Sequence, residues 1–459
     1  MAPVFIKRYG QIKGSTSLLG FRIDQREESV PIIYLEDNKN YTPVSYLIDD
    51  DYLGYAAFNY GSWQKEFFMN IKPCVLGFDG NVVFYLKKDD YTKREDTGET
   101  VDISNSSLEG NVMVEFPKSY YKIVNNEDST IDVYLSNNAI DEDFVCWAFL
   151  DENENEIPYC YMSAYNCKQY LTNIGGNSVY TLRSLSNDGK KSLSKNLDSC
   201  ISLASANGSV GNEKIWNVER YCDRTLMQIY AMLIGKSVST QEVFGHGKTD
   251  WVSGTTNIST NYSQGLYYNN MGMFAAAKTN LLESNDYRYR SYGIKFFGME
   301  DYWGMLRRHV IGISKLGHPD GGYAFYTKMN VGNGTEGGIY TPSSLLTYSA
   351  SSFLPTKMKA GNDIGFLPIE KREGISNWFS EETVNIVKSK GYRDVGYSPA
   401  GYCNFVYGGC SGYSSGKPPL NRECQGIFTI DGLGLSSSNF GSGEENRLAC
   451  SISCKPKAS

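Results

Sequence analysis

The sequence lacks a long apolar run: nowhere in its 459 residues do about 18 consecutive apolar residues occur, the length that a membrane-spanning helix needs. It also lacks a basic cluster, because 44 lysines and arginines are scattered among 51 acidic residues and the net charge is -7. Nucleic-acid-binding surfaces need concentrated positive charge. These absences predict a chain with no membrane insertion and no nucleic-acid partner.

Signatures of common enzyme sites are missing as well. No G-x-S-x-G elbow and no dinucleotide-binding fingerprint occurs. The GHGKT run at Gly245–Thr249 resembles the end of a phosphate-binding loop, but Glu242 stands where an earlier glycine is required, and DWVSG rather than a helix follows. Carboxylates are plentiful, yet the sequence pairs none of them across a cleft as glycoside hydrolysis requires. We expect no enzymatic activity, no catalytic residue and no cofactor.

Histidine is scarce, and the three present, His246, His309 and His318, have no metal-binding spacing. A histidine in an apolar setting, such as His309, is more often a core residue than a base. Cys450 and Cys454 form an isolated pair without a second half-site. The sequence therefore predicts no zinc site.

One acidic run resembles the start of a calcium-binding loop, since Asp151, Asn153 and Asn155 alternate like its first ligands. The sixth position is Glu156 rather than glycine, and the twelfth is Met162 rather than an acid. A polar turn explains the run better, so we expect no metal here either.

Eleven cysteines are scattered from Cys74 to Cys454, an odd number that suits reduced, buried thiols better than a disulfide framework in so long a chain. The first twenty residues lack the apolar segment of a secretion signal. We expect a chain made in a cytoplasm, without an essential disulfide.

What the sequence does have is tyrosine and glycine, 35 and 46 residues respectively, while long helical patterns are few. This bias favours strands and ordered loops, so the expected fold class is β-rich α+β. Tyrosine offers a rigid face with a hydrogen-bonding tip and suits surfaces that touch sugars or proteins. The alternative is that these tyrosines only fill half-buried strand positions.

The amino-acid pattern changes along the chain and predicts three parts. Residues 1–55 hold short β-like runs and are expected to be an anchor or assembly segment. Residues 56–199 read as a β-rich domain, in which Asp79-Gly80 marks a hairpin. Residues 200–459 form the last part and contain the clearest helix, at 215–234, with Gly235 placed as its C-terminal cap.

The run FFGMEDYWGMLRRHV concentrates aromatic, acidic and basic residues. Gly298 and Gly304 would permit tight turns, and the Arg307-Arg308 pair reads as a solvated face in preference to a partner contact. We expect six apolar side chains to fill the core of the last domain: Phe296, Phe297, Trp303, Leu306, Val310 and Ile313.

This run, with Gly298-Met299-Glu300-Asp301 followed by Trp303-Gly304, resembles an element of the formylglycine-generating-enzyme-like branch of the C-type lectin fold. GCSGYSSGKPP and GEENRLACSIS resemble the closing strands of that family, with Arg447 in its arginine position. The resemblance implies a C-type-lectin-like domain over residues 200–459. The family's redox-active cysteine pair and the calcium tripeptides of animal lectins are absent, so neither oxidase activity nor calcium-dependent sugar binding is carried over.

A second resemblance covers most of the chain from Tyr60 onward. GSWQKEFFMNIKPCVLGFDGNVVFYLKKDDY, DFVCWAFLDENENEI, RTLMQIYAMLIGKSVSTQEVFGHG, GIKFFGMEDYWG and CSISCKPKA occur in that order, and they resemble segments of phage and prophage tail-fibre or virion fibre proteins. This resemblance implies a virion protein of the head or tail, made in the host cytoplasm, whose partners are other virion proteins, itself as a homotrimer, and a saccharide or protein of the host surface.

Receptor binding is expected in two Gly- and Tyr-rich loops, at about 318–345 and 395–425. The candidate contact residues are Tyr323, Tyr326, Tyr340, Tyr402, Tyr407 and Tyr413. Two alternatives stay open: a purely structural capsid- or tail-decorating protein, and a polysaccharide-degrading enzyme, which the sequence does not support.

Overall fold

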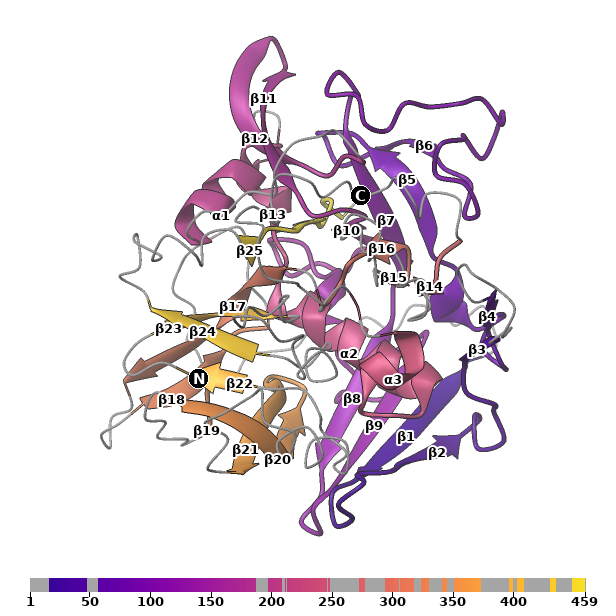
Figure 1. The fold of residues 1–459 in the computed structure, drawn as a ribbon, viewed down its shortest axis with the longest axis vertical. Helices are drawn as coiled ribbons and strands as arrows, with labels where there is room; N and C mark the ends of the chain where they lie inside the picture. The colour runs from indigo at the N-terminus through magenta and orange to yellow at the C-terminus, as the bar shows by residue number, and fades with distance from the viewer. Residues whose placement is uncertain are drawn as a thin grey trace, which may run out of the picture.

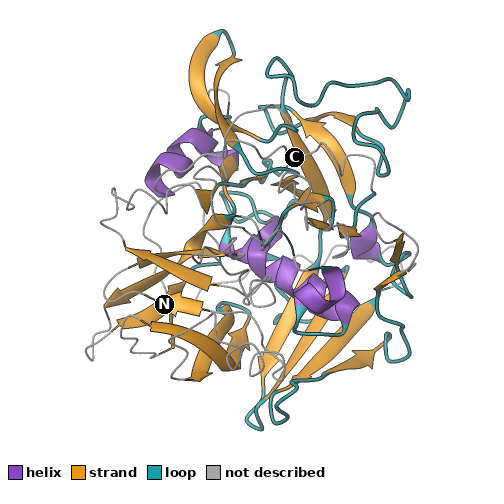
Figure 2. Cartoon of the chain, in the orientation of Figure 1, coloured by secondary structure: helices purple, strands orange, loops and turns teal. Residues whose placement is uncertain are grey.

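Strands dominate the part of the chain that the structure, a computed structural model, describes (Figures 1 and 2). The described residues are 16–47, 57–186, 197–208, 211, 213–245, 247, 272–276, 294–304, 306–317, 323–329, 341–344, 351–372, 396–398, 403–407, 430–434 and 448–458. Within them lie 26 strands and three α-helices. The β-rich fold class is therefore confirmed.

The N-terminal segment belongs to a four-stranded antiparallel sheet of order β2-β1-β9-β8. Its strands are β1 (Leu18–Asp24), β2 (Ile32–Glu36), β8 (Tyr120–Asn125) and β9 (Thr130–Ser136). Leu19, Phe21 and Ile23 of β1 are buried in the main core. Residues 18–36 thus dock onto their own chain, because β1 pairs with β9 along its whole length.

A six-stranded sheet combines both ends of the chain in the order β13-β26-β10-β7-β5-β6. Its strands are β5 (Lys72–Leu76), β6 (Val82–Tyr85), β7 (Asn111–Pro117), β10 (Tyr159–Ser163), β13 (Trp216–Val218) and β26 (Ile452–Cys454). The C-terminal strand β26 lies between β10 and β13, with Tyr161 opposite Cys454 and Trp216 opposite the same cysteine. One sheet therefore spans the position near residue 200 where the sequence suggests a domain boundary.

The Asp79-Gly80 hairpin is confirmed between β5 and β6. Gly80 has a φ of +84°, which glycine adopts without strain. The carboxylate of Asp79 accepts the backbone N–H of Asn81 at 3.0 Å and closes the turn.

A nine-stranded sheet organises the later part of the chain, in the order β19-β18-β17-β23-β24-β22-β20-β21 with β25 paired to β17. Its strands are β17 (Arg307–Gly317), β18 (Tyr323–Thr327), β19 (Thr341–Ser344), β20 (Ser351–Gly361), β21 (Gly365–Arg372), β22 (Gly396–Ser398), β23 (Cys403–Tyr407), β24 (Ile430–Gly434) and β25 (Leu448–Ala449). The smaller sheets are β3 (Ser45–Leu47) with β4 (Ala57–Asn59), β11 (Lys168–Ile174) with β12 (Asn177–Arg183), and β14 (Ala275–Ala276), β15 (Ile294–Phe296) and β16 (Met299–Glu300).

The helices are α1 (Leu197–Ser205), α2 (Tyr221–Gly235) and α3 (Thr240–Phe244), with short 3₁₀ turns at Phe67–Met69, Trp147–Phe149 and Glu213–Ile215. The helix predicted at 215–234 starts six residues later, because Trp216–Val218 pairs with β26 as a strand. Gly235 is the last helical residue rather than the cap, and Lys236 adopts the left-handed conformation after it. A Cβ at Gly235 would lie 3.2 Å from Val243 and from Phe244, so close packing accounts for this glycine.

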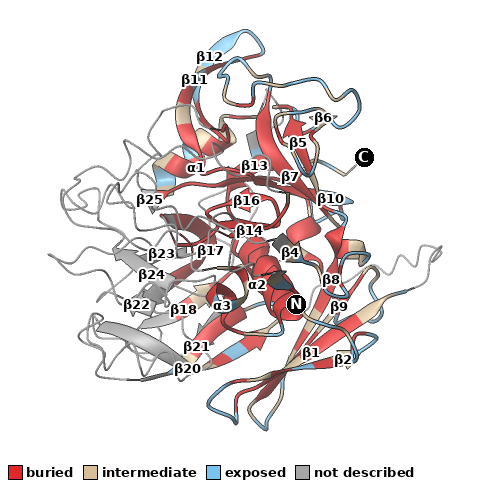
Figure 3. Ribbon diagram, turned by 45° about the vertical axis from the view of Figure 1, so that its right-hand side comes forward, coloured by how far each residue is buried: buried red, intermediate tan, exposed pale blue. Residues whose placement is uncertain are grey.

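Helix α2 is the centre of the molecule, and every one of its residues is buried (Figure 3). The ring of Tyr230 in α2 packs at a tilt against Phe68 and Phe297, at centroid distances of 4.8 and 5.5 Å. The carbonyl of Ile234 accepts the backbone N–H of Val44 at 2.9 Å. The main hydrophobic core includes residues from positions 19 to 366, so the N-terminal segment, the β-rich part and the later part pack as one body.

Candidate binding surfaces

The predicted receptor-contact tyrosines fall in the least described part of the chain. Tyr340, Tyr402 and Tyr413 lie outside the described residues, as does most of the two loops. Tyr323 and Tyr326 belong to β18, and Tyr407 belongs to β23. The structure thus places three of the six candidates on strands rather than loops.

Strand β17 separates the two groups of strand tyrosines. Tyr326 is half-buried and pairs with Ser314, whereas Tyr407 pairs with Arg308. The two positions on β17 are six residues apart, or roughly 20 Å along a strand. These two tyrosines share a sheet, but their backbones do not lie side by side.

The FFGMEDYWG run is interior, as its apolar residues suggest. All six expected core side chains are at most 1% exposed: Phe296, Phe297, Trp303, Leu306, Val310 and Ile313. Gly298 and Gly304 have φ values of +80° and +90°, which agrees with their expected turn role. Trp303 donates its indole N–H to the carbonyl of Gly245 at 3.0 Å. This run positions the core and offers no surface to a ligand.

Inside this run, the ring of Tyr302 is in contact with two arginines. The guanidinium of Arg224 is 4.1 Å from the ring centroid, and that of Arg308 is 5.1 Å from it. The Tyr302 hydroxyl donates to Glu219, which also pairs with Arg224 Nε at 2.9 Å. Burial raises the pKa of Tyr302 well above its ordinary value, so the phenol stays protonated and holds its hydrogen bond.

The expectation of a solvated face at Arg308 is wrong. Its side chain is fully buried and donates to the carbonyls of Glu300 and Asp301 at 2.8 and 3.1 Å. Burial lowers the pKa of Arg308, because desolvation disfavours its charge. The two carbonyls and the face of Tyr302 replace part of its lost hydration.

The acidic turn at Asp151 is confirmed as a turn, although its first residue is buried rather than solvated. The Asp151 carboxylate accepts backbone N–H groups of Asn153, Asn155 and Ala458, at 2.8, 2.9 and 3.2 Å. Burial acts to raise the pKa of Asp151, but these donors outweigh it and the pKa is lowered. The oxygens that a calcium ion would need already bind the protein's own backbone.

A surface hollow of about 350 Å³ lies along β6, the outer strand of the six-stranded sheet. Its walls are formed by Val82, Val83, Phe84, Tyr85, Glu95 and Asp96. Aromatic faces beside carboxylates suit a sugar ring, whose C–H face stacks on the aromatics while its hydroxyls donate to the acids.

The side chains around this hollow are held in place by their neighbours. Arg94 covers the ring of Phe84 at 4.7 Å and binds Asp96 through paired hydrogen bonds of 2.7 and 3.0 Å. This contact lowers the pKa of Asp96, so the carboxylate is ionised at neutral pH. Tyr85 donates its hydroxyl to buried Glu115 at 2.9 Å. The two acids of the hollow adjoin in sequence and so do not form the facing pair that glycoside hydrolysis uses.

The β11–β12 hairpin projects from the body at the top of Figure 1. Leu171 and Tyr180 are directly paired across it and are 61% and 58% exposed. A paired apolar surface on a two-stranded ribbon can contact another protein.

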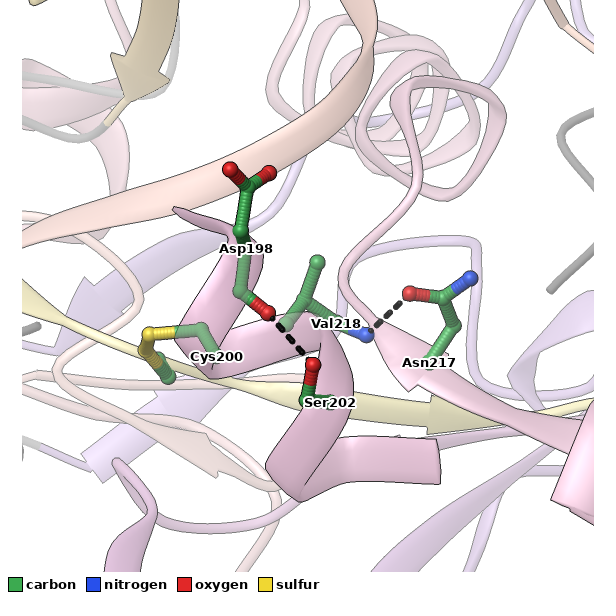
Figure 4. Close-up of a disulfide and its surroundings, with 6 residues drawn as sticks. Asp198, Cys200, Ser202, Asn217 and Val218 are labelled. Carbon is green, nitrogen blue, oxygen red and sulfur yellow. Dashed lines mark hydrogen bonds between the residues drawn. A yellow bond between two sulfur atoms is a disulfide. The ribbon is translucent and has the colours of Figure 1, made fainter. Parts of the chain in front are cut away.

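One pair of buried cysteines departs from the expectation of reduced thiols. Cys200 of α1 and Cys450, which follows β25, are joined by a disulfide (Figure 4). The helix holds Cys200 in place through local bonds such as that from Ser202 Oγ to the carbonyl of Asp198 at 2.9 Å. A ring nitrogen of His309 lies within 4.8 Å of both sulfur atoms, although its position in the sequence has no metal-binding spacing. His246 and His318 lie outside the described residues.

Sequence reasoning missed the hollow and the cysteine cluster for different reasons. The hollow could have been found from the VVFY run of β6. Successive side chains on a strand point to opposite faces, so four consecutive apolar residues in an outer strand cannot all point into the core. The cluster had no such signal, since Cys200 and Cys450 are 250 residues apart.

Comparison of the sequence with known proteins identifies no family for this chain. No protein-family model matches the sequence, and a search of curated proteins finds no match. No helix in the described ranges is long and apolar enough to cross a membrane.

Proposed function

We propose that this chain is a phage virion fibre or spike protein that takes part in recognising the surface of the host cell. The resemblance of five segments, in order, to phage fibre proteins supports the virion assignment. The hollow along β6 supports recognition, because it combines half-buried aromatic side chains with carboxylates. That hollow is the observation on which the proposed ligand class, a host-surface saccharide, rests.

The second part of this proposal concerns the last domain. Residues 200–459 would be a C-type-lectin-like domain with additional contacts in the loops that follow β18 and precede and follow β23. Strands β17, β18 and β23 are adjacent in one sheet, so these loops share one structural support. If loops 318–345 and 395–425 are moved from this chain into a relative, the relative should then acquire the host preference of this chain.

Binding of the labelled full-length chain to intact cells of candidate hosts tests the function. The proposal predicts saturable binding to some hosts and competition with whole phage. A chain that is folded, by circular dichroism, and binds no host at micromolar concentration would contradict receptor recognition.

Two variants locate the contact within the hollow. The double change Glu95→Gln and Asp96→Asn keeps the size of the side chains but removes both charges, and we expect at least about a tenfold loss of affinity from lost charge-assisted hydrogen bonds. Glu27→Gln is the matched control, because Glu27 is an exposed acid in the turn after β1. Equal loss in both variants would mean that only net charge matters.

A purely structural virion protein is the second candidate, and the exposed Leu171–Tyr180 pair favours it. Under this alternative the hairpin would be covered by a neighbouring subunit in the particle. Protection of this pair from labelling in whole virions, together with no binding to cells, would replace the first proposal with the second.

A further inference from the structure

Cys200, His309 and Cys450 bring three metal-ligating side chains together from distant parts of the sequence. One ligand atom from each lies within 4.8 Å of the other two. The three side chains are 0%, 2% and 0% exposed. This cluster shares no residue with the hollow along β6.

The sheet explains why His309 and Cys450 meet. Strands β17 and β25 pair in parallel, with Arg308 opposite Ala449. His309 follows Arg308 on β17, and Cys450 directly follows the end of β25, so the two residues are adjacent where the strands run side by side. Helix α1, which packs on β12 and β13, supplies Cys200 from a third element.

A third cysteine, Cys167, is paired with Cys450. Cys167 forms an isolated antiparallel bridge with Cys450, donating its backbone N–H to that residue's carbonyl at 2.7 Å. Directly opposite residues of an antiparallel pair project to the same face. Cys167 is fully buried and is not part of a disulfide, and its thiol donates to the carbonyl of Tyr165 at 3.8 Å.

These features fit a metal ion at least as well as they fit a crosslink. A disulfide uses the two cysteines alone, whereas a metal ion would also be bound by the nearby His309. The Cα atoms of Cys200 and Cys450 are 6.6 Å apart, near the upper end of the disulfide range of about 4.4–6.8 Å. Donor atoms on a tetrahedral zinc are roughly 3.5–3.8 Å apart, given Zn–S and Zn–N bonds of about 2.3 and 2.0 Å. Small side-chain rotations would bring the two thiolates to that separation.

We propose that Cys200, His309 and Cys450 bind one Zn²⁺ ion when the two cysteines are reduced. Two Zn–S bonds and one Zn–N bond form, the two thiol protons pass to solvent, and no electron is transferred. The fourth position of the tetrahedron is filled by Cys167 or by a water molecule. The ion would tie α1 and β17 to the C-terminal strands, so binding it would stabilise the folded chain.

Metal titration of the full-length chain tests this inference. The chain is purified without oxygen, reduced with a phosphine, freed of metal and titrated with Co²⁺ as a spectroscopic probe and then with Zn²⁺. We expect about one metal per chain, thiolate-to-cobalt charge-transfer absorption, and displacement of the cobalt by zinc.

Three variants assign the ligands. Cys200→Ser and His309→Asn should each weaken zinc binding by at least about tenfold, because each removes a metal bond. Cys160→Ala is the matched control, since it removes a buried thiol of β10 that lies in a different core cluster, and it should bind zinc as the parent does. Unchanged binding by His309→Asn, or equal loss in Cys160→Ala, would overturn the assignment.

A measurement on the parent chain covers the case in which the variants fail to fold. Zinc-edge X-ray absorption should show two or three sulfur neighbours and at least one nitrogen; fewer than two sulfurs would overturn the site. A reduced parent chain that folds normally but binds neither Co²⁺ nor Zn²⁺ would leave only the Cys200–Cys450 disulfide, and the proposal would fall.

Discussion

Tyr302 donates its hydroxyl proton to Oε1 of Glu219 across 2.7 Å, and both side chains are buried. The same carboxylate pairs with Arg224, whose guanidinium lies over the tyrosine ring. A buried carboxylate is costly unless it is paired and hydrogen-bonded. Glu219 therefore joins the start of α2 to the run that contains Tyr302, and the acidic and aromatic residues of that run have a structural explanation.

Glu219→Gln should lower the free energy of unfolding by about 3 kcal/mol, because buried Arg224 loses its carboxylate partner. Tyr302→Phe should cost about 1–2 kcal/mol, since it removes one hydrogen bond and keeps the ring beside the two arginines. Urea unfolding followed by fluorescence measures both changes. A smaller loss for Glu219→Gln than for Tyr302→Phe would show that the ion pair is not the main contribution.

Gly298→Ala should destabilise the protein by about 2–4 kcal/mol, because its φ of +80° disfavours a side chain and the new Cβ would lie 2.7 Å from Met273. Gly176→Ala is the matched control: its φ is +85°, but nothing lies within 4 Å of the added Cβ. Strain alone should cost the control about 1 kcal/mol. Equal melting temperatures for the two variants would contradict the steric argument.

Asp151→Asn should reduce stability at pH 7 by about 1 kcal/mol, since charge-assisted bonds to three backbone donors become neutral ones. The folded-state pKa of Asp151 is lowered, so its contribution is present above the unfolded value of about 3.9 and is lost as pH falls through the folded value. The two proteins should therefore converge in stability below about pH 3. Chemical unfolding from pH 2 to pH 7 measures the difference, and a gap that persists at pH 2 would argue against ionisation as its cause.

Calcium should leave the melting temperature of the unmodified protein unchanged, because the Asp151 oxygens are already occupied by backbone N–H groups. Differential scanning fluorimetry with millimolar Ca²⁺ and with a chelator makes the comparison. A rise of several degrees with calcium, absent in Asp151→Asn, would restore the calcium-loop interpretation.

Removal of residues 1–36 should give an aggregating chain rather than a soluble one, because it deletes β1 and leaves β9 without a partner on that side. A point variant isolates the packing effect. Phe21→Ala should cost about 3–5 kcal/mol at a buried site, whereas Ile33→Ala in the adjacent strand, where the side chain is 45% exposed, should cost less than about 1 kcal/mol. If the truncated chain is stable and elutes as a single species in size-exclusion chromatography, residues 1–36 are not needed for folding, and the interpretation of this segment as a detachable anchor would be favoured.

Local features of this protein could be predicted from the sequence because local chemistry decides them. Asp79-Gly80 forms its hairpin through one side-chain acceptor and one positive φ. The apolar spacing of α2 predicted a helix, but Trp216–Val218 became a strand because a distant strand was available to pair with it. The error is confined to the boundary at which tertiary pairing competes with local preference.

The sequence by itself determined the β-rich fold class, the turn at Asp151 and the apolar interior of the FFGMEDYWG run, since composition, turn residues and hydrophobicity act over a few positions. Only the tertiary structure decided that β26 enters the sheet of the N-terminal half, that Arg308 is buried, and that Cys200, His309 and Cys450 meet. Each of these depends on pairing between residues far apart in the chain, whose register is set by the packing of the whole core rather than by any short segment.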